Sequence, residues 1–188
     1  YDLPLDSPPE TILDLGANTG LTAIYFGRKY PGARLACVEP VPDNLRVLAQ
    51  NLALNAIPAE VIAGAVHINC GSVRIELDAM DYGHKVAQGQ QTSSRPSIEV
   101  AAYDMPAILR HLGWQRIGLL KVDIEGHEKI LFSTNCDWLQ FVDAMCIECH
   151  PEFGEADLVT IAGKYGFDSP MQLPGIWLLR RGSRISKP

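Results

Sequence analysis

Hydrophobic residues gather into short apolar runs, and stretches with helical spacing separate these runs along the first part of the chain. Runs of about four to eight apolar residues bounded by turn residues are typical of buried strands. After Pro42, Leu45, Leu48 and Leu52 recur at a spacing of three and four and form one apolar helix face. The predicted strands here are 11–17, 33–40 and 59–66, and the predicted helices are 21–29 and 42–55. Strands that alternate with helices predict an α/β fold with a mainly parallel sheet.

This rhythm breaks in the middle of the chain and then resumes. Residues 72–77 and 97–103 alternate like exposed antiparallel strands, and the polar segment 80–97 between them has no hydrophobic period. Such a long loop is often a lid over a site, so we expect a lid-like loop or hairpin insertion around 72–103. Beyond it, the predicted helices are 105–114, 127–140 and 155–167, and the predicted strands are 119–126, 143–150 and 175–181. The chain, 1–188, is predicted to be a single doubly wound domain.

Composition and charge narrow the classes of function. With 47% hydrophobic and 20% charged residues, the chain has the composition of a folded globular domain. Its formal net charge is −6, and basic residues cluster only around Arg180, Arg181 and Arg184, which disfavours a nucleic-acid-binding surface. No apolar run reaches the ~18 residues of a membrane helix, and no signal-peptide pattern opens the sequence. The five cysteines are odd in number and three of them lie inside apolar runs, which suits reduced thiols, so we expect a cytoplasmic protein that binds neither nucleic acid nor membranes.

The turn after the first predicted strand reads D-L-G-A-N-T-G, in which Gly16 and Gly20 flank Asn18. Glycine allows the backbone to adopt positive φ and to pass close to a ligand. Glu39 stands at the end of the second predicted strand, 23 positions after Gly16. In open α/β sheets, ligands bind at the carboxyl ends of the strands, and an acid in this place binds the hydroxyls of a ribose. The two features together predict a cofactor that contains a nucleoside.

Two cofactors fit a glycine turn followed by an acid. NAD is bound by G-x-G-x-x-G, because its pyrophosphate approaches the backbone and the helix N-terminus. Here Asn18 stands in place of the middle glycine, and no third glycine follows where it is needed. Asp14 lies two residues before Gly16, and a carboxylate there repels a pyrophosphate but can order a cationic amino acid. The turn therefore favours S-adenosylmethionine, which carries an ammonium and a sulfonium and no phosphate, and it leaves NAD as the alternative.

Five blocks of sequence resemble, in their order, those of the FkbM-type methyltransferases: ILDLGANTG, VEP, the Asp104 of VAAYD, LLKVDIEGHE and IECHP. The resemblance covers about Thr11 to Pro151, and L-K-x-D-x-E-G-x-E is its most specific part. These enzymes are class I S-adenosylmethionine-dependent methyltransferases that act mostly on hydroxyls of polyketides, sugars and other natural products. The resemblance implies a Rossmann-like, doubly wound fold with a mostly parallel sheet and one antiparallel terminal strand.

The resemblance also assigns residues to the parts of the cofactor. The glycine turn would wrap the methionine half, Glu39 would bind the ribose, and the adenine would lie near Pro40 and the end of the third strand. Asp123 and Glu125 would lie beside the transferable methyl group. The implied cofactor-binding residues are Asp14, Gly16, Ala17, Asn18, Gly20, Glu39, Pro40, Ala65, Val66 and Asp123.

The predicted strand 119–126 carries charges where a strand covered on both faces is normally apolar. Its charged residues alternate with apolar ones, so a period of two places all of them on one face. Glu148 has the corresponding position in the next predicted strand. Because an unpaired buried charge is costly, we expect Lys121 to pair with Glu148 or with Asp14 deeper in the sheet.

Three residues beyond Lys121 are the candidates for catalysis. Asp123, Glu125 and His150 are expected to cluster at the strand ends, where the cofactor would lie. An alcohol that accepts a methyl group must lose its proton, and a carboxylate or a neutral imidazole can take it. His150 is the first candidate for this base and Glu125 the second, while Asp123 would orient the ammonium of the donor. Each has a structural alternative, because Glu125 could cap the following helix and His150 could be a surface residue.

These inferences lead to one predicted function and two alternatives. The chain is expected to move a methyl group from S-adenosylmethionine to a hydroxyl oxygen of a small-molecule or glycan acceptor. The alternatives are an NAD-dependent oxidoreductase and a non-catalytic module that binds a nucleoside or a protein partner. No ligand spacing specifies a metal site, so none is expected. Asp104 is expected to cap the helix that begins at Met105, and the sequence leaves the acceptor and the oligomeric state open.

Overall fold

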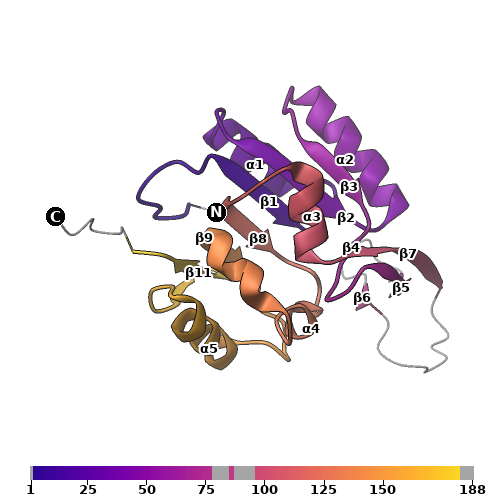
Figure 1. Cartoon of the computed structure of the whole chain (residues 1–188). Helices are drawn as coiled ribbons and strands as arrows, with labels where there is room; N and C mark the ends of the chain where they lie inside the picture. Colours follow the sequence, from indigo (N-terminus) through magenta and orange to yellow (C-terminus); the bar gives the residue numbers. More distant parts are fainter. Residues whose placement is uncertain (1, 78–84, 87–95, 183–188) are drawn as a thin grey trace.

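The computed structural model describes residues 2–77, 85–86 and 96–182. Within these ranges the central sheet has seven strands: β1 (Thr11–Leu15), β2 (Arg34–Glu39), β3 (Glu60–Ala63), β8 (Ile117–Val122), β9 (Val142–Ile147), β10 (Met171–Leu173) and β11 (Ile176–Arg180). Their order is β10-β11-β9-β8-β1-β2-β3, and all neighbours from β9 to β3 are parallel (Figure 1). β11 runs antiparallel to β9, and the short β10 pairs antiparallel with β11. The predicted α/β fold with a mostly parallel sheet and a reversed last strand is confirmed.

A second, smaller sheet contains β4 (Ala65–Val66), β5 (Gly71–Glu76), β6 (Lys85–Val86) and β7 (Ser97–Tyr103) in the order β4-β7-β5-β6. β5 and β7 pair antiparallel, as their alternation predicts. The prediction of one strand over 59–66 is wrong, because β3 and β4 belong to different sheets. The chain changes sheets at Gly64, where a Cβ atom would lie only 2.8 Å from the carbonyl oxygen of Ala101. Most of the predicted lid loop, 80–97, lies outside the described residues.

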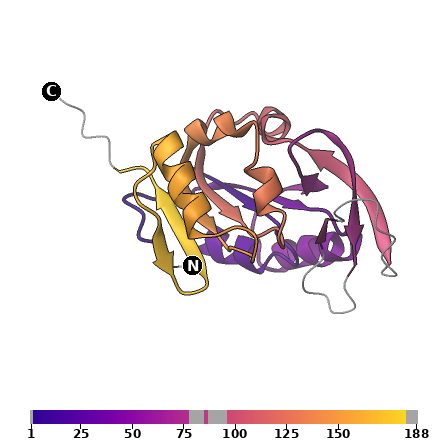
Figure 2. The ribbon, with the colours of Figure 1, turned by 90° about the horizontal axis from the view of Figure 1, so that it is seen from below.

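Helices cover both faces of the central sheet, as Figure 2 shows. They are α1 (Leu21–Lys29), α2 (Pro42–Leu54), α3 (Met105–Leu112), α4 (Glu128–Leu131), the 3-10 helix η1 (Cys136–Phe141) and α5 (Glu155–Tyr165). α1 and α2 lie on one face, and the others lie on the opposite face. The single helix predicted over 127–140 is wrong. It ends after one turn, because the Ser133 hydroxyl donates to the Ile130 carbonyl and Asn135 takes a left-handed φ of 55°.

Alternation along the strands of the central sheet gives each of its two faces a core cluster of its own. Leu13 and Leu15 of β1 are buried under the face that carries α3 and α5. Ile12 is buried on the other face with Phe26 of α1 and Leu48 of α2. By the same period of two, the side chain of Asp14 points toward α1 and α2, into an apolar layer.

A buried ion pair lies in this apolar layer. Asp14 and Lys121 are register partners in β1 and β8, and the Lys121 Nζ lies 3.0 Å from Asp14 Oδ1 and 3.6 Å from Asp123 Oδ2. Their side chains are 0% and 3% exposed. Burial raises the pKa of Asp14, and the charge of Lys121 acts in the opposite direction. Of the two partners that the sequence allows for Lys121, the structure therefore pairs it with Asp14.

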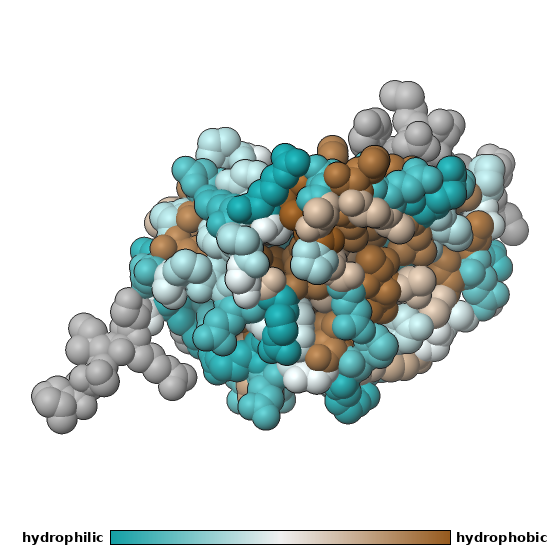
Figure 3. All heavy atoms as spheres, turned by 90° about the horizontal axis from the view of Figure 1, so that it is seen from above, coloured by the Kyte–Doolittle hydropathy of each residue, from teal (hydrophilic) through white to brown (hydrophobic). Residues whose placement is uncertain are grey.

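The surface shows what surrounds these layers. Figure 3, the view from above Figure 1, shows hydrophobic side chains gathered near the centre with hydrophilic ones around them. The exposed apolar side chains include Leu54 at the end of α2 and Val61 on β3. Folded proteins normally expose such groups, so they identify no partner. Among the described residues, none of the helices has both the length and the hydrophobicity that crossing a bilayer requires.

The buried pair gives the first prediction. Lys121→Met should lower the free energy of unfolding by about 3–5 kcal/mol, because Asp14 then remains buried without an opposite charge. The double variant Asp14→Leu/Lys121→Met should recover a large part of this loss, because no buried charge is left. Urea denaturation at neutral pH measures both changes.

The matched control is the exposed pair between Arg46 and Asp43, whose side chains are 66% and 90% exposed. Arg46→Met should change the free energy of unfolding by less than about 1 kcal/mol. A loss in Lys121→Met that is no larger than in this control would show that the buried pair contributes nothing to stability.

Candidate functional site

A cleft lies at the carboxyl ends of β1, β2 and β8, beside the small sheet. Its enclosed volume is about 70 Å³, below the ~300–1,000 Å³ of typical small-molecule sites, and it widens into open solvent. Its lining comes from the turns after β1, β2 and β8 and from both sheets. The lining residues are Gly16, Asn18, Val38, Glu39, Pro40, Val41, Asn44, Gly64, Ala65, Val66, Ile75, Asp123, Ile124, Glu125 and His127.

The glycine turn packs directly against the end of β8. Gly16 has a φ of 75°, and a Cβ atom there would lie 1.8 Å from the carbonyl oxygen of Asp123, so no other residue fits this backbone. The Nζ of Lys121 donates to the Gly16 carbonyl at 2.8 Å, and the Gly16 N–H donates to the Val38 carbonyl at 3.0 Å. The turn is therefore fixed to both neighbouring strands.

Glu39 joins the glycine turn to the start of α2. Its Oε2 accepts from the Asn18 N–H at 2.9 Å, and its Oε1 accepts from the Val41 N–H at 2.9 Å and from the Asn44 amide at 3.2 Å. The residue is 4% exposed and also lines the cleft. These hydrogen bonds give Glu39 a structural role at the position where a ribose-binding acid is expected.

Three of the implied cofactor-binding residues are not among those that line the cleft. Asp14 is buried in its ion pair, and Ala17 is 4% exposed behind the turn. Gly20 has a φ of 85° at the N-terminus of α1, where a Cβ atom would lie 2.4 Å from Cδ1 of Leu48. Its absent side chain therefore lets α1 pack against α2, while the cleft is formed by residues nearer the sheet.

The chain leaves β8 by a strained turn rather than by a longer strand. The predicted strand 119–126 is wrong beyond Val122, where β8 ends. Glu125 has a left-handed φ of 55° and Gly126 a φ of 93°. A non-glycine residue in this conformation costs about 1–3 kcal/mol, and such strain concentrates at functional sites. The position of the Glu125 side chain is therefore set by this turn and not by the alternation of a strand.

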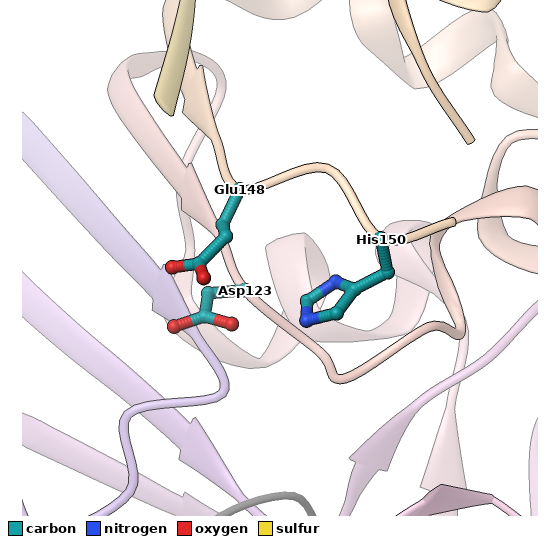
Figure 4. A group of neighbouring side chains, drawn as sticks. All are labelled: Asp123, Glu148 and His150. Atoms are coloured by element: carbon teal, nitrogen blue, oxygen red, sulfur yellow. The ribbon is translucent and has the colours of Figure 1, made fainter. Parts of the chain in front are cut away.

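Three of the predicted polar residues converge beside the cleft (Figure 4). One ligand atom each of Asp123, Glu148 and His150 lies within 4.8 Å of the other two. Burial and the neighbouring charge of Asp123 raise the pKa of Glu148. Such a cluster could bind a cation or accept a proton, and the Lys121 ammonium already lies 3.6 Å from Asp123 Oδ2. The expected gathering of Asp123, Glu125 and His150 is present, since His150 Nε2 also lies 3.5 Å from Glu125 Oε2.

Two further residues of the site have no predicted role in the sequence. Glu128 is fully buried, and its Oε1 lies 3.0 Å from Nδ1 of His150. His127 is 3% exposed and lines the cleft, with its ring centroid 5.0 Å from that of His67. Burial lowers the pKa of His127 to about 4, so its ring is neutral near pH 7. Both residues come directly after the strained turn, in the stretch E-G-H-E. The sequence pattern does not show which side chains they contact.

The chain is similar in sequence to known methyltransferases. The profile of the family described as "Methyltransferase FkbM domain" matches residues 14–167. Methyltransferase sdnD of Sordaria araneosa is 29% identical over 163 residues, which cover 68% of this chain and 61% of that protein. The 31-O-demethyl-FK506 methyltransferase FkbM of Streptomyces tacrolimicus is 23% identical over 193 residues, covering 85% of this chain and 73% of that protein. The chain thus spans only about three fifths of the length of the first of these relatives.

Solved structures share the fold at low sequence identity. Methyltransferase FkbM from Methylobacillus flagellatus matches with a TM-score of 0.62 and 16% identity, over 95% of this chain and 45% of that one. Aeropyrum pernix fibrillarin, solved in complex with natively bound S-adenosyl-L-methionine, matches with a TM-score of 0.54 and 15% identity, over 94% of this chain and 67% of that one. These likenesses show a Rossmann-like fold of the class I methyltransferase type. The family profile matches most of the chain, from Asp14 in β1 past the end of α5. The chain therefore belongs to the FkbM methyltransferase domain family.

Proposed function

We propose that this chain transfers a methyl group from S-adenosylmethionine to a hydroxyl oxygen of a small molecule or glycan. The observation that carries the proposal is the charge of the cleft. Its lining includes the carboxylates Glu39, Asp123 and Glu125 and, within the described residues, neither lysine nor arginine. Such a cleft attracts a cationic ligand and repels the pyrophosphate of NAD, so it favours the sulfonium cofactor over the dinucleotide.

The residues that line the cleft suit the three parts of this cofactor chemically. Gly16 and Asp123 line the cleft together at the ends of β1 and β8, and the carboxylate of Asp123 suits an ammonium-bearing amino acid. Glu39, at the end of the neighbouring strand β2, also lines the cleft, and its carboxylate suits the hydroxyls of a ribose. Val66 and Ile75, with the neutral ring of His127, form an uncharged wall that suits the adenine.

The residues of the chain would supply orientation and a proton acceptor. When bound, S-adenosylmethionine supplies a methyl group on a positively charged sulfur, which keeps the electron pair of the broken carbon–sulfur bond as the acceptor oxygen forms its bond to carbon. The acceptor hydroxyl must be held within about 3 Å of that carbon and in line with the bond that breaks. Its proton passes to Nε2 of His150, which faces the cluster of Asp123 and Glu148.

The family relationship supports a hydroxyl acceptor. The Streptomyces tacrolimicus relative is named for methylation of 31-O-demethyl-FK506, a reaction at oxygen on a natural product. We extend this acceptor class to the present chain as part of the proposal, together with a cytoplasmic location and a single catalytic domain. The non-catalytic module remains the rival, and the measurements below separate it from an enzyme.

Donor binding gives the second prediction. Calorimetric titration should show micromolar binding of S-adenosylhomocysteine and no binding of NAD. Glu39→Gln should weaken the former about 10- to 100-fold, because a hydrogen bond from a ribose to a charged acceptor contributes roughly 1.5–3 kcal/mol. Glu60→Gln, at a half-exposed acid on β3, should bind as the wild type does.

Each result of these titrations has a definite meaning. Unchanged affinity in Glu39→Gln would remove the ribose assignment. Binding of NAD alone would overturn the proposed cofactor, and binding of neither ligand would favour the non-catalytic module.

Transfer itself gives the third prediction. With labelled S-adenosylmethionine and a panel of hydroxylated natural products and sugars, the wild type should transfer label, and His150→Gln should lower kcat about 10²- to 10⁴-fold. Affinity for S-adenosylhomocysteine should stay the same in this variant, because the imidazole acts on the acceptor. Equal kcat in the two proteins would exclude His150 as the base, and label appearing on nitrogen or carbon would exclude hydroxyl methylation.

Burial of His127 gives the fourth prediction, on stability against pH. Its pKa of about 4 in the folded protein lies below the ordinary 6.5, so the unfolded chain binds more protons between these values. Stability should therefore be complete above pH 6.5 and fall as the pH drops toward 4, by up to about 3 kcal/mol from this residue. In His127→Asn the slope should flatten, while His111→Asn, at an exposed histidine, should keep it. Urea denaturation at several pH values checks this, and an unchanged slope in His127→Asn would refute the assignment.

A further inference from the structure

Glu128 is a buried carboxylate with an unusual set of neighbours. It lies in the first turn of α4 and is 0% exposed. Its Oε1 accepts from the backbone N–H groups of Ile124 at 3.1 Å and Gly126 at 3.3 Å, and it lies 3.0 Å from Nδ1 of His150. Its Oε2 is also buried and has no hydrogen-bond partner among the described residues. Burying a carboxylate in this way is costly, so a purely local role in the turn is a poor account of it.

The geometry selects one tautomer of His150. An ionised carboxylate only accepts hydrogen bonds, so the ring nitrogen that contacts it must carry the hydrogen. With Nδ1 protonated, the neutral ring keeps its lone pair on Nε2. The competing carboxylate, Glu125, is 3.5 Å from Nε2, and its side chain is 34% exposed. The shorter contact to a carboxylate held by two backbone N–H groups is the stronger one, so Glu128 decides the tautomer.

The selected lone pair faces the place where a proton acceptor is needed. Nε2 of His150 points toward Asp123 and Glu148, as Figure 4 shows. A metal-binding histidine is often oriented by a carboxylate in the same manner, so the arrangement suits either a base or a ligand. Here the Lys121 ammonium lies 3.6 Å from Asp123 Oδ2 and already supplies positive charge to the cluster. That charge offsets part of the negative charge of the cluster and so weakens it as a site for a divalent cation.

We propose that Glu128 is a positioning residue: it holds His150 with the hydrogen on Nδ1, so that Nε2 is the atom that takes the proton of the acceptor hydroxyl. The tautomer of His150 follows from the structure alone. That Nε2 takes a proton from an acceptor hydroxyl rests on the proposed function. Glu128 itself touches neither the donor nor the acceptor. Its effect is to keep one imidazole in one orientation and one protonation pattern, as an oriented base requires.

The fifth prediction tests the tautomer and its consequence separately. In the full chain labelled with ¹⁵N-histidine, NMR at pH 8 should show His150 with a protonated Nδ1 and an unprotonated Nε2, the signals being assigned by their loss in His150→Gln. In Glu128→Gln the ring should become a mixture of both tautomers. The same variant should lower kcat about 10- to 100-fold with the KM for the donor unchanged, as loss of an orienting carboxylate does elsewhere. Glu152→Gln, at an exposed acid two residues after His150, is the matched control and should change neither reading.

The possible results either support or overturn the inference. A hydrogen on Nε2 at pH 8 in the wild type, or an unchanged kcat in Glu128→Gln, would overturn it. A shift of the Nε2 signal on addition of micromolar Zn²⁺ or Mn²⁺, lost in His150→Gln, would also overturn it and assign the cluster to a metal. If Glu128→Gln fails to fold, the tautomer of the wild type decides alone. If no acceptor is methylated, the proposed function fails while the NMR result on Glu128 remains valid.

Discussion

The buried ammonium of Lys121 is the contact on which the site depends. It lies between β1 and β8, pairs with Asp14, donates to the Gly16 carbonyl and reaches Asp123. One positive charge therefore contacts two carboxylates and fixes the backbone where the two strands end. Without it, Asp14 would be an isolated charge in an apolar layer, which costs several kcal/mol. Lys121 thus supports the cleft from inside the sheet, while Asp123 and Glu125, which follow it in the chain, line the cleft.

The cleft is shaped by backbone that ordinary residues do not adopt easily. Gly16 fits against the Asp123 carbonyl only because it lacks a Cβ atom. Glu125 takes a left-handed conformation in the turn after β8. The carboxylate of Glu128 stabilises that turn by accepting hydrogen bonds from two of its backbone N–H groups. Such strain persists only where the surroundings hold it, and here a buried carboxylate does so. The same carboxylate contacts His150, so the strained turn and the proposed base share one support.

The acidic character of the cleft separates the candidate cofactors more sharply than the glycine pattern does. A turn with Asn18 in place of a glycine is only a departure from the dinucleotide motif. Glu39 suits the ribose of either cofactor, whereas the carboxylates of Asp123 and Glu125 beside the glycine turn disfavour a pyrophosphate there. Membership of the FkbM methyltransferase domain family is consistent with this chemistry.

From local periodicity and short motifs the sequence predicted most of the strand and helix order, the mainly parallel sheet and the helix cap at Asp104, while the resemblance to the FkbM-type methyltransferases implied the reversed last strand and most of the cofactor-binding residues. It did not reveal that β8 ends at Val122 or that the helix over 127–140 is broken, since strand alternation and helix periodicity continue past both points. Which carboxylate neutralises Lys121, and which one orients His150, only the tertiary structure decided. Those choices depend on distances between residues far apart in the chain, and no pattern along the sequence records them.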